Sequence, residues 1–327
     1  MAGLRRIVNG PKRSGNRRVR PVALHHRIEA DPAARTGGHS LPESRGAPER
    51  LDLVGVGLVS AGVVALVWAL SRANQVGWSS AEVLGTLVAG PALLVAFVWW
   101  ERSVSQPLVP LRLFALRDFA LGNVTTFLMS AAIFAAGLFV TEEFQLAREY
   151  SPVGAGLRLL PFFATPMLVS PIAGALSDRI GRRPIMVVGL SLLTAGLAWV
   201  AWRGSLDTSW IELVIALLVA GVGVSMALPT VPTAVLSAVA PPEIGKASGI
   251  NYMAQRFGAV FGIAIGTTVF GSYGRLGTPA TMTAGFEPAL WTCAALAVLA
   301  TLSALAITSS RRQAPNQAEL ADLPIAA

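Results

Sequence analysis

A short segment at residues 174–184, with the sequence GALSDRIGRRP, holds the residues whose types and spacing are most specific. Gly174 would allow two helices to approach closely, and Gly181 would allow a tight turn. Asp178 would cap the following helix and complement its N-terminal dipole, or pair with a nearby arginine. The arginines alone would fit any loop on the cytoplasmic side of a membrane, but the complete pattern favours a specific loop between two spans. The residues of this motif are Gly174, Asp178, Arg179, Gly181, Arg182 and Arg183.

Polar side chains inside or beside apolar stretches form a second set of candidates, for a cavity or for ion pairs. Ionisable residues at membrane depth are costly and often functional. Glu142 and Glu143, however, lie at the outer end of a span, where water can solvate them. Arg158, one turn inside the next span, would form a structural ion pair with one of them or with Glu149. The complete set is Asn123, Glu142, Glu143, Gln145, Arg158, Asn251, Gln255 and Arg256. Gln255 and Arg256 could instead anchor a span at the membrane interface.

The sequence contains no catalytic or metal-binding constellation. Its three histidines, His25, His26 and His39, all lie in the first 50 residues, and its one cysteine, Cys293, lies in an apolar stretch. It also lacks a nucleophile elbow and a phosphate-binding glycine loop. We therefore expect no catalytic residues, no metal site and no cofactor. A membrane enzyme is the weaker alternative to a protein without enzymatic activity.

The elements that position these residues are eight charge-free stretches. Only 13% of the residues are charged, whereas soluble domains carry about 25%. The stretches are 53–71, 83–100, 119–141, 159–177, 184–202, 213–242, 257–274 and 288–310. Each is at least 18 residues long, and a helix needs roughly 20 residues to cross the hydrocarbon core. The stretch 213–242 is longer than one span needs. Backbone groups in lipid must be paired within their own segment. Each stretch therefore predicts one helix, and Pro229 and Pro232 are expected to kink the sixth or to end it early.

The charges outside these stretches predict how the protein is oriented. Residues 1–50 hold eleven Lys or Arg and four Asp or Glu, without an apolar run, so we expect a disordered tail. Such a tail could attract anionic lipid or nucleic acid, but we favour a solvated tail and expect no nucleic-acid partner. The loops on the tail's side carry nine basic residues against four on the other side. The positive-inside rule therefore places both termini in the cytoplasm of a multi-pass protein of the cell membrane.

The lengths of the connections divide the chain into five parts. They are a basic cytoplasmic tail at 1–50, a two-helix transmembrane pair at 51–101, a cytoplasmic linker at 102–118, a six-helix transmembrane half at 119–310 and a C-terminal cytoplasmic tail at 311–327. The predicted fold class is all-α transmembrane with eight helices, arranged as a pair followed by a half of six.

The motif at 174–184 resembles the signature loop of the major facilitator superfamily. In that superfamily the loop recurs between the second and third helices of each six-helix half, which is its place here. The two spans in front are similar to the central pair of the fourteen-span drug:proton antiporter family. Four further segments resemble that family: 150–161, 221–229, 243–249 and 251–258. The resemblance covers about residues 41–310.

This resemblance implies a transporter in the lipid bilayer that exports small amphipathic organic compounds in exchange for protons. It also implies an N-terminal six-helix half that carries a membrane-embedded acid, an arginine and a glycine-proline motif, none of which can be placed in this sequence. We therefore expect a truncated transporter, with a separate N-terminal half as a partner. The alternative is an inactive fragment or a membrane partner protein without transport of its own.

Overall fold

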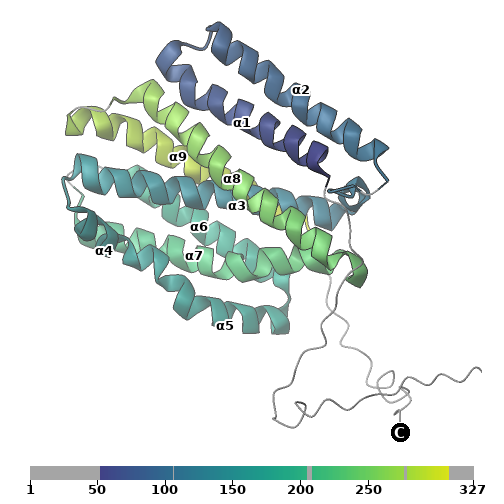
Figure 1. Cartoon of the computed structure of the whole chain (residues 1–327). Helices are drawn as coiled ribbons and strands as arrows, with labels where there is room; N and C mark the ends of the chain where they lie inside the picture. The colour runs from purple at the N-terminus through teal and green to yellow at the C-terminus, as the bar shows by residue number, and fades with distance from the viewer. Residues whose placement is uncertain (1–51, 106, 205–207, 276–277, 309–327) are drawn as a thin grey trace, which may run out of the picture. The chain divides into compact units, whose positions relative to one another are not determined.

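Every regular element of this computed structural model is helical within the residues that the structure describes, which are 52–105, 107–204, 208–275 and 278–308 (Figure 1). The α-helices are α1 Leu53–Val76, α2 Ala81–Ser103, α3 Arg117–Glu142, α4 Pro152–Phe163, α5 Thr165–Ile180, α6 Arg182–Arg203, α7 Trp210–Ser237, α8 Ile244–Tyr273 and α9 Pro279–Leu305. Two 3₁₀ turns, η2 Leu111–Ala115 and η4 Pro241–Glu243, and one π-helical turn, η3 Glu143–Ala147, lie between them. The predicted tails at 1–50 and 311–327 lie outside the described residues.

Eight segments of the described chain are long and apolar enough to cross a membrane, as predicted. The π-helical turn η3 extends α3, and α4 and α5 together make one span. The all-α transmembrane fold class is therefore confirmed, and the chain is a multi-pass membrane protein.

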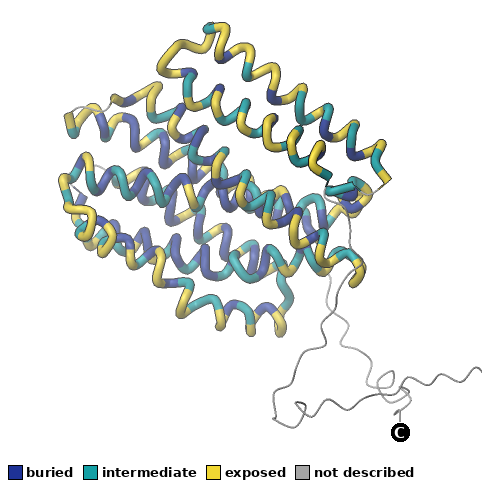
Figure 2. Tube along the Cα trace, viewed as in Figure 1, coloured by how far each residue is buried: buried dark blue, intermediate teal, exposed yellow. Residues whose placement is uncertain are grey.

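The interior of the six-helix part is formed mainly by α3, α6, α7 and α9. Helix α6 packs on α7 and α9, and α3 packs on α8 and α9. Figure 2 shows buried positions concentrated on these helices. Large apolar side chains fill the space between them, among them Phe139, Leu190, Leu217 and Leu290. Because lipid is as apolar as these side chains, close packing stabilises the contacts more than transfer from solvent does.

Glycines let α8 approach α3 closely. A Cβ added at Gly262 would lie 2.6 Å from the carbonyl carbon of Ala131, and one added at Gly258 would lie 2.9 Å from Cα of Phe127. Gly266 continues the same row one turn further along the helix. No side chain can fit between the two backbones at Gly258 and Gly262, whereas a Cβ at Gly266 would meet the ring of Phe139. The first two glycines therefore set the distance between α3 and α8.

Helices α1 and α2 form a pair that meets the six-helix part through α1 and α8. Near the C-terminal end of α1, Asn74 Nδ2 donates to the carbonyl of Thr268 at 2.5 Å, and Thr268 Oγ1 donates to the carbonyl of Leu70 at 2.8 Å. Most other residues of the pair are exposed or partly exposed, as the colours of Figure 2 show, and many of them are apolar. In a membrane this surface faces lipid, which needs no polar cover.

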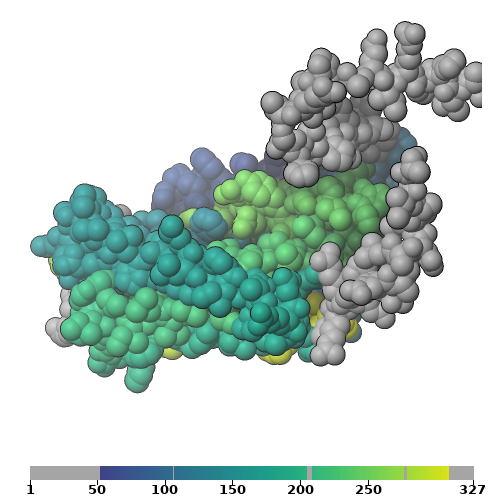
Figure 3. Space-filling view, turned by 90° about the horizontal axis from the view of Figure 1, so that it is seen from below, coloured from purple at the N-terminus to yellow at the C-terminus, as the bar shows by residue number. Residues whose placement is uncertain are grey.

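The span predicted at 159–177 is interrupted, because α4 and α5 meet at Ala164. Pro166 explains the break, since it has no N–H to donate to the carbonyl of Phe162 and its ring excludes that carbonyl from a helical position. Both helices pack on α7, along which they lie in the view of Figure 3. A Cβ at Gly221 of α7 would lie 3.0 Å from the Phe162 carbonyl oxygen. The glycine therefore leaves room for the broken region.

Helix α7 passes through both of its internal prolines and continues to Ser237. Pro229 cannot donate to the carbonyl of Ser225, but Ser170 Oγ of α5 donates to that carbonyl at 3.0 Å. A neighbouring helix thus satisfies the backbone group that the proline leaves free, as membrane interiors require. Neither proline ends the helix, so that alternative of the prediction is wrong; the kink expected at Pro229 and Pro232 stays a prediction.

Candidate functional site

The segment 174–184 contains the end of α5, a connection of one residue and the start of α6. That residue is Gly181, whose φ of 96° lies in the left-handed region that glycine adopts without strain, so the predicted tight turn is present. A Cβ at Gly174 would meet no atom within 4 Å. The buried face of α5 near this loop carries Ala173 and Ser177 instead. The close helix approach predicted at Gly174 is therefore wrong.

Asp178 is exposed and does not cap α6. The N-cap of α6 is Gly181, which offers no side-chain hydrogen bond, and Asp178 lies three residues earlier, in the last turn of α5. Among the residues that the structure describes, Asp178 also forms no ion pair with an arginine. Both roles predicted for this carboxylate are wrong for the conformation seen here, and its side chain remains available at the surface.

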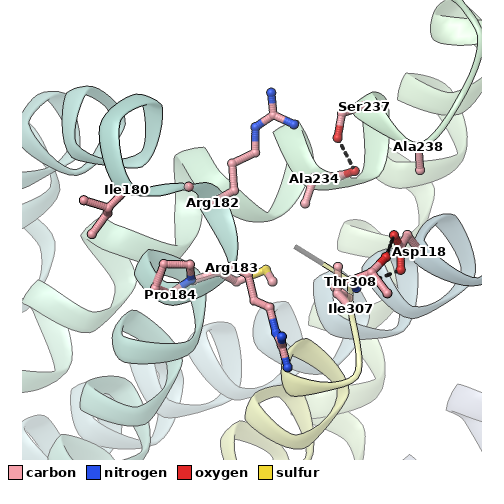
Figure 4. A pocket seen from close by; sticks show the side chains of 12 residues that line it. Asp118, Ile180, Arg182, Arg183, Pro184, Ala234, Ser237, Ala238, Ile307 and Thr308 are labelled. Atoms are coloured by element: carbon pink, nitrogen blue, oxygen red, sulfur yellow. Dashed lines mark hydrogen bonds between the residues drawn. The ribbon is translucent and has the colours of Figure 1, made fainter. Parts of the chain in front are cut away.

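Arg182 and Arg183 point in different directions from the start of α6 (Figure 4). Arg183 Nη2 donates to the carbonyl of Leu305 at 2.6 Å, which places a cation at the C-terminus of α9, where the helix dipole favours it. A cavity of about 240 Å³ lies beside this contact. On its wall, Asp118 of α3 accepts hydrogen bonds from Thr308, from the backbone N–H at 3.0 Å and from the hydroxyl. The loop and Asp118 thus tie α6 and α3 to the same end of α9.

The two predicted asparagines come together between α3 and α8. Asn251 Nδ2 lies 3.3 Å from Asn123 Oδ1 and 2.8 Å from Thr126 Oγ1. Asn123 Nδ2 donates to the carbonyl of Phe119 at 2.9 Å. All three polar side chains are buried. This amide cluster, defined as Asn123, Thr126 and Asn251, fixes the register of α3 on α8, because a slip of either helix would leave buried polar groups unpaired.

A buried ion pair lies at the opposite end of α3, in η3. Glu143 Oε1 is 3.3 Å from Arg148 Nε, and Arg148 Nη1 donates to the carbonyl of Thr208 at 3.2 Å. The backbone N–H of Arg148 also donates to the carbonyl of Glu143, the i to i+5 bond of a π-helix. Sequence reasoning missed Arg148, because a spacing of five residues does not place two side chains together on an ordinary α-helix.

Arg158 stacks on aromatic rings and does not bind a glutamate. Its guanidinium carbon lies 3.9 Å from the ring centroid of Tyr150 and 5.7 Å from that of Trp210. Such cation–π contacts stabilise a desolvated cation. Within the described part of the chain its Nε is buried without a hydrogen-bond partner. The ion pair predicted for Arg158 is therefore wrong: Arg148 occupies Glu143, and within the described chain Arg158 pairs with neither Glu142 nor Glu149.

The remaining candidates do not complete a single site. Glu142 and Gln145 are partly buried near η3. Gln255 is partly buried and Arg256 is exposed, both one to two turns after Asn251 on α8. The guanidinium of Arg256 lies 4.7 Å from the ring centroid of Tyr252. The eight predicted residues thus divide into two groups. Glu142, Glu143, Gln145 and Arg158 lie around η3 and on α4, and Asn123, Asn251, Gln255 and Arg256 lie where the first half of α3 meets the first half of α8 or follow on α8.

Comparison with known families identifies the fold. A family model described as the Major Facilitator Superfamily matches residues 119–327. The chain belongs to this superfamily. The match begins inside α3, so it covers the six-helix part and leaves α1 and α2 in front of it. The predicted resemblance to the superfamily is confirmed, and the 174–184 loop lies between the second and third spans of the matched part.

Several relatives within the superfamily are named for export or resistance. The chain is 33% identical over 216 residues to the multidrug resistance protein Stp of Mycobacterium tuberculosis, which is 66% of this chain and 40% of the relative. It is 34% identical over 256 residues to the puromycin resistance protein of Streptomyces alboniger, with coverages of 76% and 49%. It is 32% identical over 244 residues to the cephamycin export protein of Amycolatopsis lactamdurans, with coverages of 73% and 50%. The chain thus spans 40% to 50% of the length of these relatives.

Proposed function

We propose that this chain forms the C-terminal eight helices of a fourteen-span drug exporter, which exports amphipathic organic compounds in exchange for protons. The position of the 174–184 loop carries the proposal. The loop connects the second and third spans of a six-helix part, and a separate helix pair, α1 and α2, precedes that part. This arrangement matches the central pair and the second half of a fourteen-span antiporter.

The names of the relatives support the substrate class. Besides the proteins described above, the chain is 30% identical over 220 residues to a tetracenomycin C resistance and export protein of Streptomyces glaucescens, which is 67% of this chain and 40% of the relative. These names refer to different antibiotics. A binding surface of mainly apolar character, with few polar groups, fits such a range of amphipathic compounds better than a site built for one compound.

Transporters of this fold work by rocking two halves about a site near the membrane midplane. The present chain supplies one half, and a six-helix N-terminal half completes the transport unit. Gln255 and Arg256 are our candidates for contact with substrate, because they are not fully buried. The amide cluster and the Glu143–Arg148 pair are enclosed by other residues, so we assign them to holding the half together. Both termini lie in the cytoplasm in this proposal, since the loops on that side carry the excess of basic residues.

Transport in proteoliposomes tests the proposal. The purified chain would be reconstituted alone and together with the N-terminal six-helix half of the puromycin resistance relative, with a proton gradient imposed and ethidium as the fluorescent substrate. Ethidium flux is expected with both halves and not with the chain alone. The flux should collapse when an ionophore dissipates the proton gradient.

Asp178→Asn provides the variant for the loop, and Glu287→Gln provides the matched control. Both carboxylates are exposed, and Glu287 lies on α9 away from the loop. We expect Asp178→Asn to lower the flux with unchanged protein yield and Glu287→Gln to leave it unaltered. Absence of flux from correctly folded protein in both reconstitutions would favour a membrane partner without transport of its own.

A further inference from the structure

A cleft of about 420 Å³ separates the α1–α2 pair from α3 and α8. Its walls come from both helices of the pair, from the connection between α2 and α3, and from the first halves of α3 and α8. Representative wall residues are Val59, Phe97, Leu108, Val124, Phe127 and Phe257. The volume lies within the range of about 300–1,000 Å³ that is usual for small-molecule sites.

Among the residues that the structure describes, the wall of the cleft carries one polar side chain, that of Asn123. The amide nitrogen of Asn123 donates to the carbonyl of Phe119, and its amide oxygen accepts from Asn251. The part of a ligand that enters the cleft must therefore be apolar, because a polar group would lose its hydrogen bonds to water without replacement.

The cleft is open at the side of the helix bundle. Val124 and Phe114 on its walls are 48% and 40% exposed, although most of the neighbouring positions on α3 are buried. All four helices that form the walls are membrane spans. The medium at this opening is therefore lipid, and the apolar groups most abundant there are acyl chains.

Two cationic side chains follow or precede wall residues of the cleft on the same helices, and no acidic side chain of the described chain engages them. Arg102 and Arg117 are exposed and pair with no acidic residue of the described chain. Arg102 lies five residues beyond Phe97 on α2, and Arg117 lies three residues before Ala120 on α3. At 1.5 Å per residue these distances are about 7.5 Å and 4.5 Å along the helix axes, so each arginine lies within two helical turns of a wall residue.

The acidic side chains at this end are bound by the protein or enclosed in it. Asp52 accepts from the Gly55 N–H and from Trp100. Glu101 is buried; its Oε2 accepts from the Val109 N–H, and its Oε1 has no hydrogen-bond partner in the described chain. Glu243 pairs with Arg112, and Asp118 binds Thr308. The accessible charge beside the cleft is therefore positive, and a basic surface at the cytoplasmic end of membrane helices favours anionic headgroups.

We propose that this cleft binds an anionic phospholipid, with one acyl chain between the α1–α2 pair and the α3–α8 pair and the headgroup at Arg102 and Arg117. The bound lipid fills the space that the two pairs leave between them. This site does not depend on transport, so its test stands apart from that of the proposed function.

Native mass spectrometry of the full chain tests the proposal. The purified protein would be equilibrated in detergent with equal amounts of phosphatidylglycerol and phosphatidylcholine of the same acyl composition. We expect one retained phospholipid per chain, with phosphatidylglycerol favoured. Each arginine near the surface contributes about 1 kcal/mol, or about five-fold, so Arg102→Gln and Arg117→Gln should each lower the preference by about that factor. Equal retention of the two lipids by the unaltered chain would overturn the headgroup assignment.

Val124→Trp places a large side chain in the cleft from a partly exposed position, and Val88→Trp is its control. Val88 is 70% exposed on α2 and does not line the cleft. We expect Val124→Trp to abolish lipid retention and Val88→Trp to preserve it. Equal retention by the two variants would overturn the proposal.

A measurement without any substitution covers the case in which Val124→Trp fails to fold. Phosphatidylglycerol with a diazirine on one acyl chain would be photo-crosslinked to the unaltered chain in vesicles, and the adducts would be located by peptide sequencing. Adducts concentrated on wall residues such as Phe97 and Phe257 support the site. Adducts spread evenly over lipid-exposed residues such as Met167 would overturn it.

Discussion

Replacing Arg148 by methionine should destabilise the fold strongly, because the Glu143 carboxylate would stay buried without its partner. The two charged groups are 3.3 Å apart, and the side chains of Arg148 and Glu143 are 7% and 2% exposed. Methionine retains much of the length of arginine but donates no hydrogen bond. Removing one partner of a buried ion pair costs about 3–5 kcal/mol. At about 2–4 °C per kcal/mol, the midpoint of thermal unfolding should fall by about 6–20 °C.

Cys293 provides the assay for this prediction. It is the chain's one cysteine and is fully buried in α9, packed within the main core. A thiol-reactive fluorescent dye therefore reacts with the chain only when the core opens. Fluorescence recorded during a temperature ramp, on protein in a mild detergent, gives the unfolding midpoint of each variant.

Arg203→Met is the matched control. Arg203 also pairs with a glutamate, Glu212, at 2.5 Å, but the two side chains are 47% and 28% exposed. Solvent screens such a pair, so its loss should not shift the midpoint measurably. The double variant Glu143→Gln with Arg148→Met should unfold at a higher temperature than Arg148→Met alone, because it leaves no buried charge. The reasoning is refuted if Arg148→Met unfolds at the same temperature as Arg203→Met.

Two further predictions concern the contacts of α8. Gly262→Leu should lower the free energy of unfolding by about 1–3 kcal/mol, because its side chain meets the backbone of α3, whereas Gly249→Leu should have little effect, since a Cβ at Gly249 meets open space. The same dye assay measures both, and equal midpoints would contradict the packing described for Gly262. Asn74→Leu removes the hydrogen bond to the Thr268 carbonyl, so amide exchange measured by mass spectrometry should become faster in α1 and stay unchanged in α9. Faster exchange in both helices would instead indicate a general loss of stability.

The number and order of the spans could be predicted because a bilayer imposes a minimum length on each apolar run. The bounds were less predictable where charged residues continue a helix. Helix α8 begins at Ile244, thirteen residues before the charge-free stretch at 257–274, and includes Lys246 and Arg256. Charged side chains at the end of a span reach the interface and do not stop the helix. The absence of charge therefore marks the hydrocarbon region and not the whole helix.

The candidate site was harder to predict, because its contacts join residues that are distant in the sequence. Asn123 and Asn251 were both recognised as candidates, but 128 positions separate them, and no local pattern indicates that they meet. The partner of Glu143 depended on a π-helical turn, for which the sequence gives no recognised signal. The break at Pro166 had a local signal, a proline inside an apolar run, but Pro229 and Pro232 carry the same signal and do not end α7.

The row of glycines on α8 limits how this protein can diverge over evolutionary time. At Gly258 and Gly262 the neighbouring atoms belong to the backbone of α3, which no single substitution elsewhere can make smaller. A larger residue would push the helices apart and separate Asn251 from Thr126. Natural variation should therefore accumulate on the exposed side of α8, at positions such as Tyr252, while the row facing α3 keeps small residues even in distant relatives.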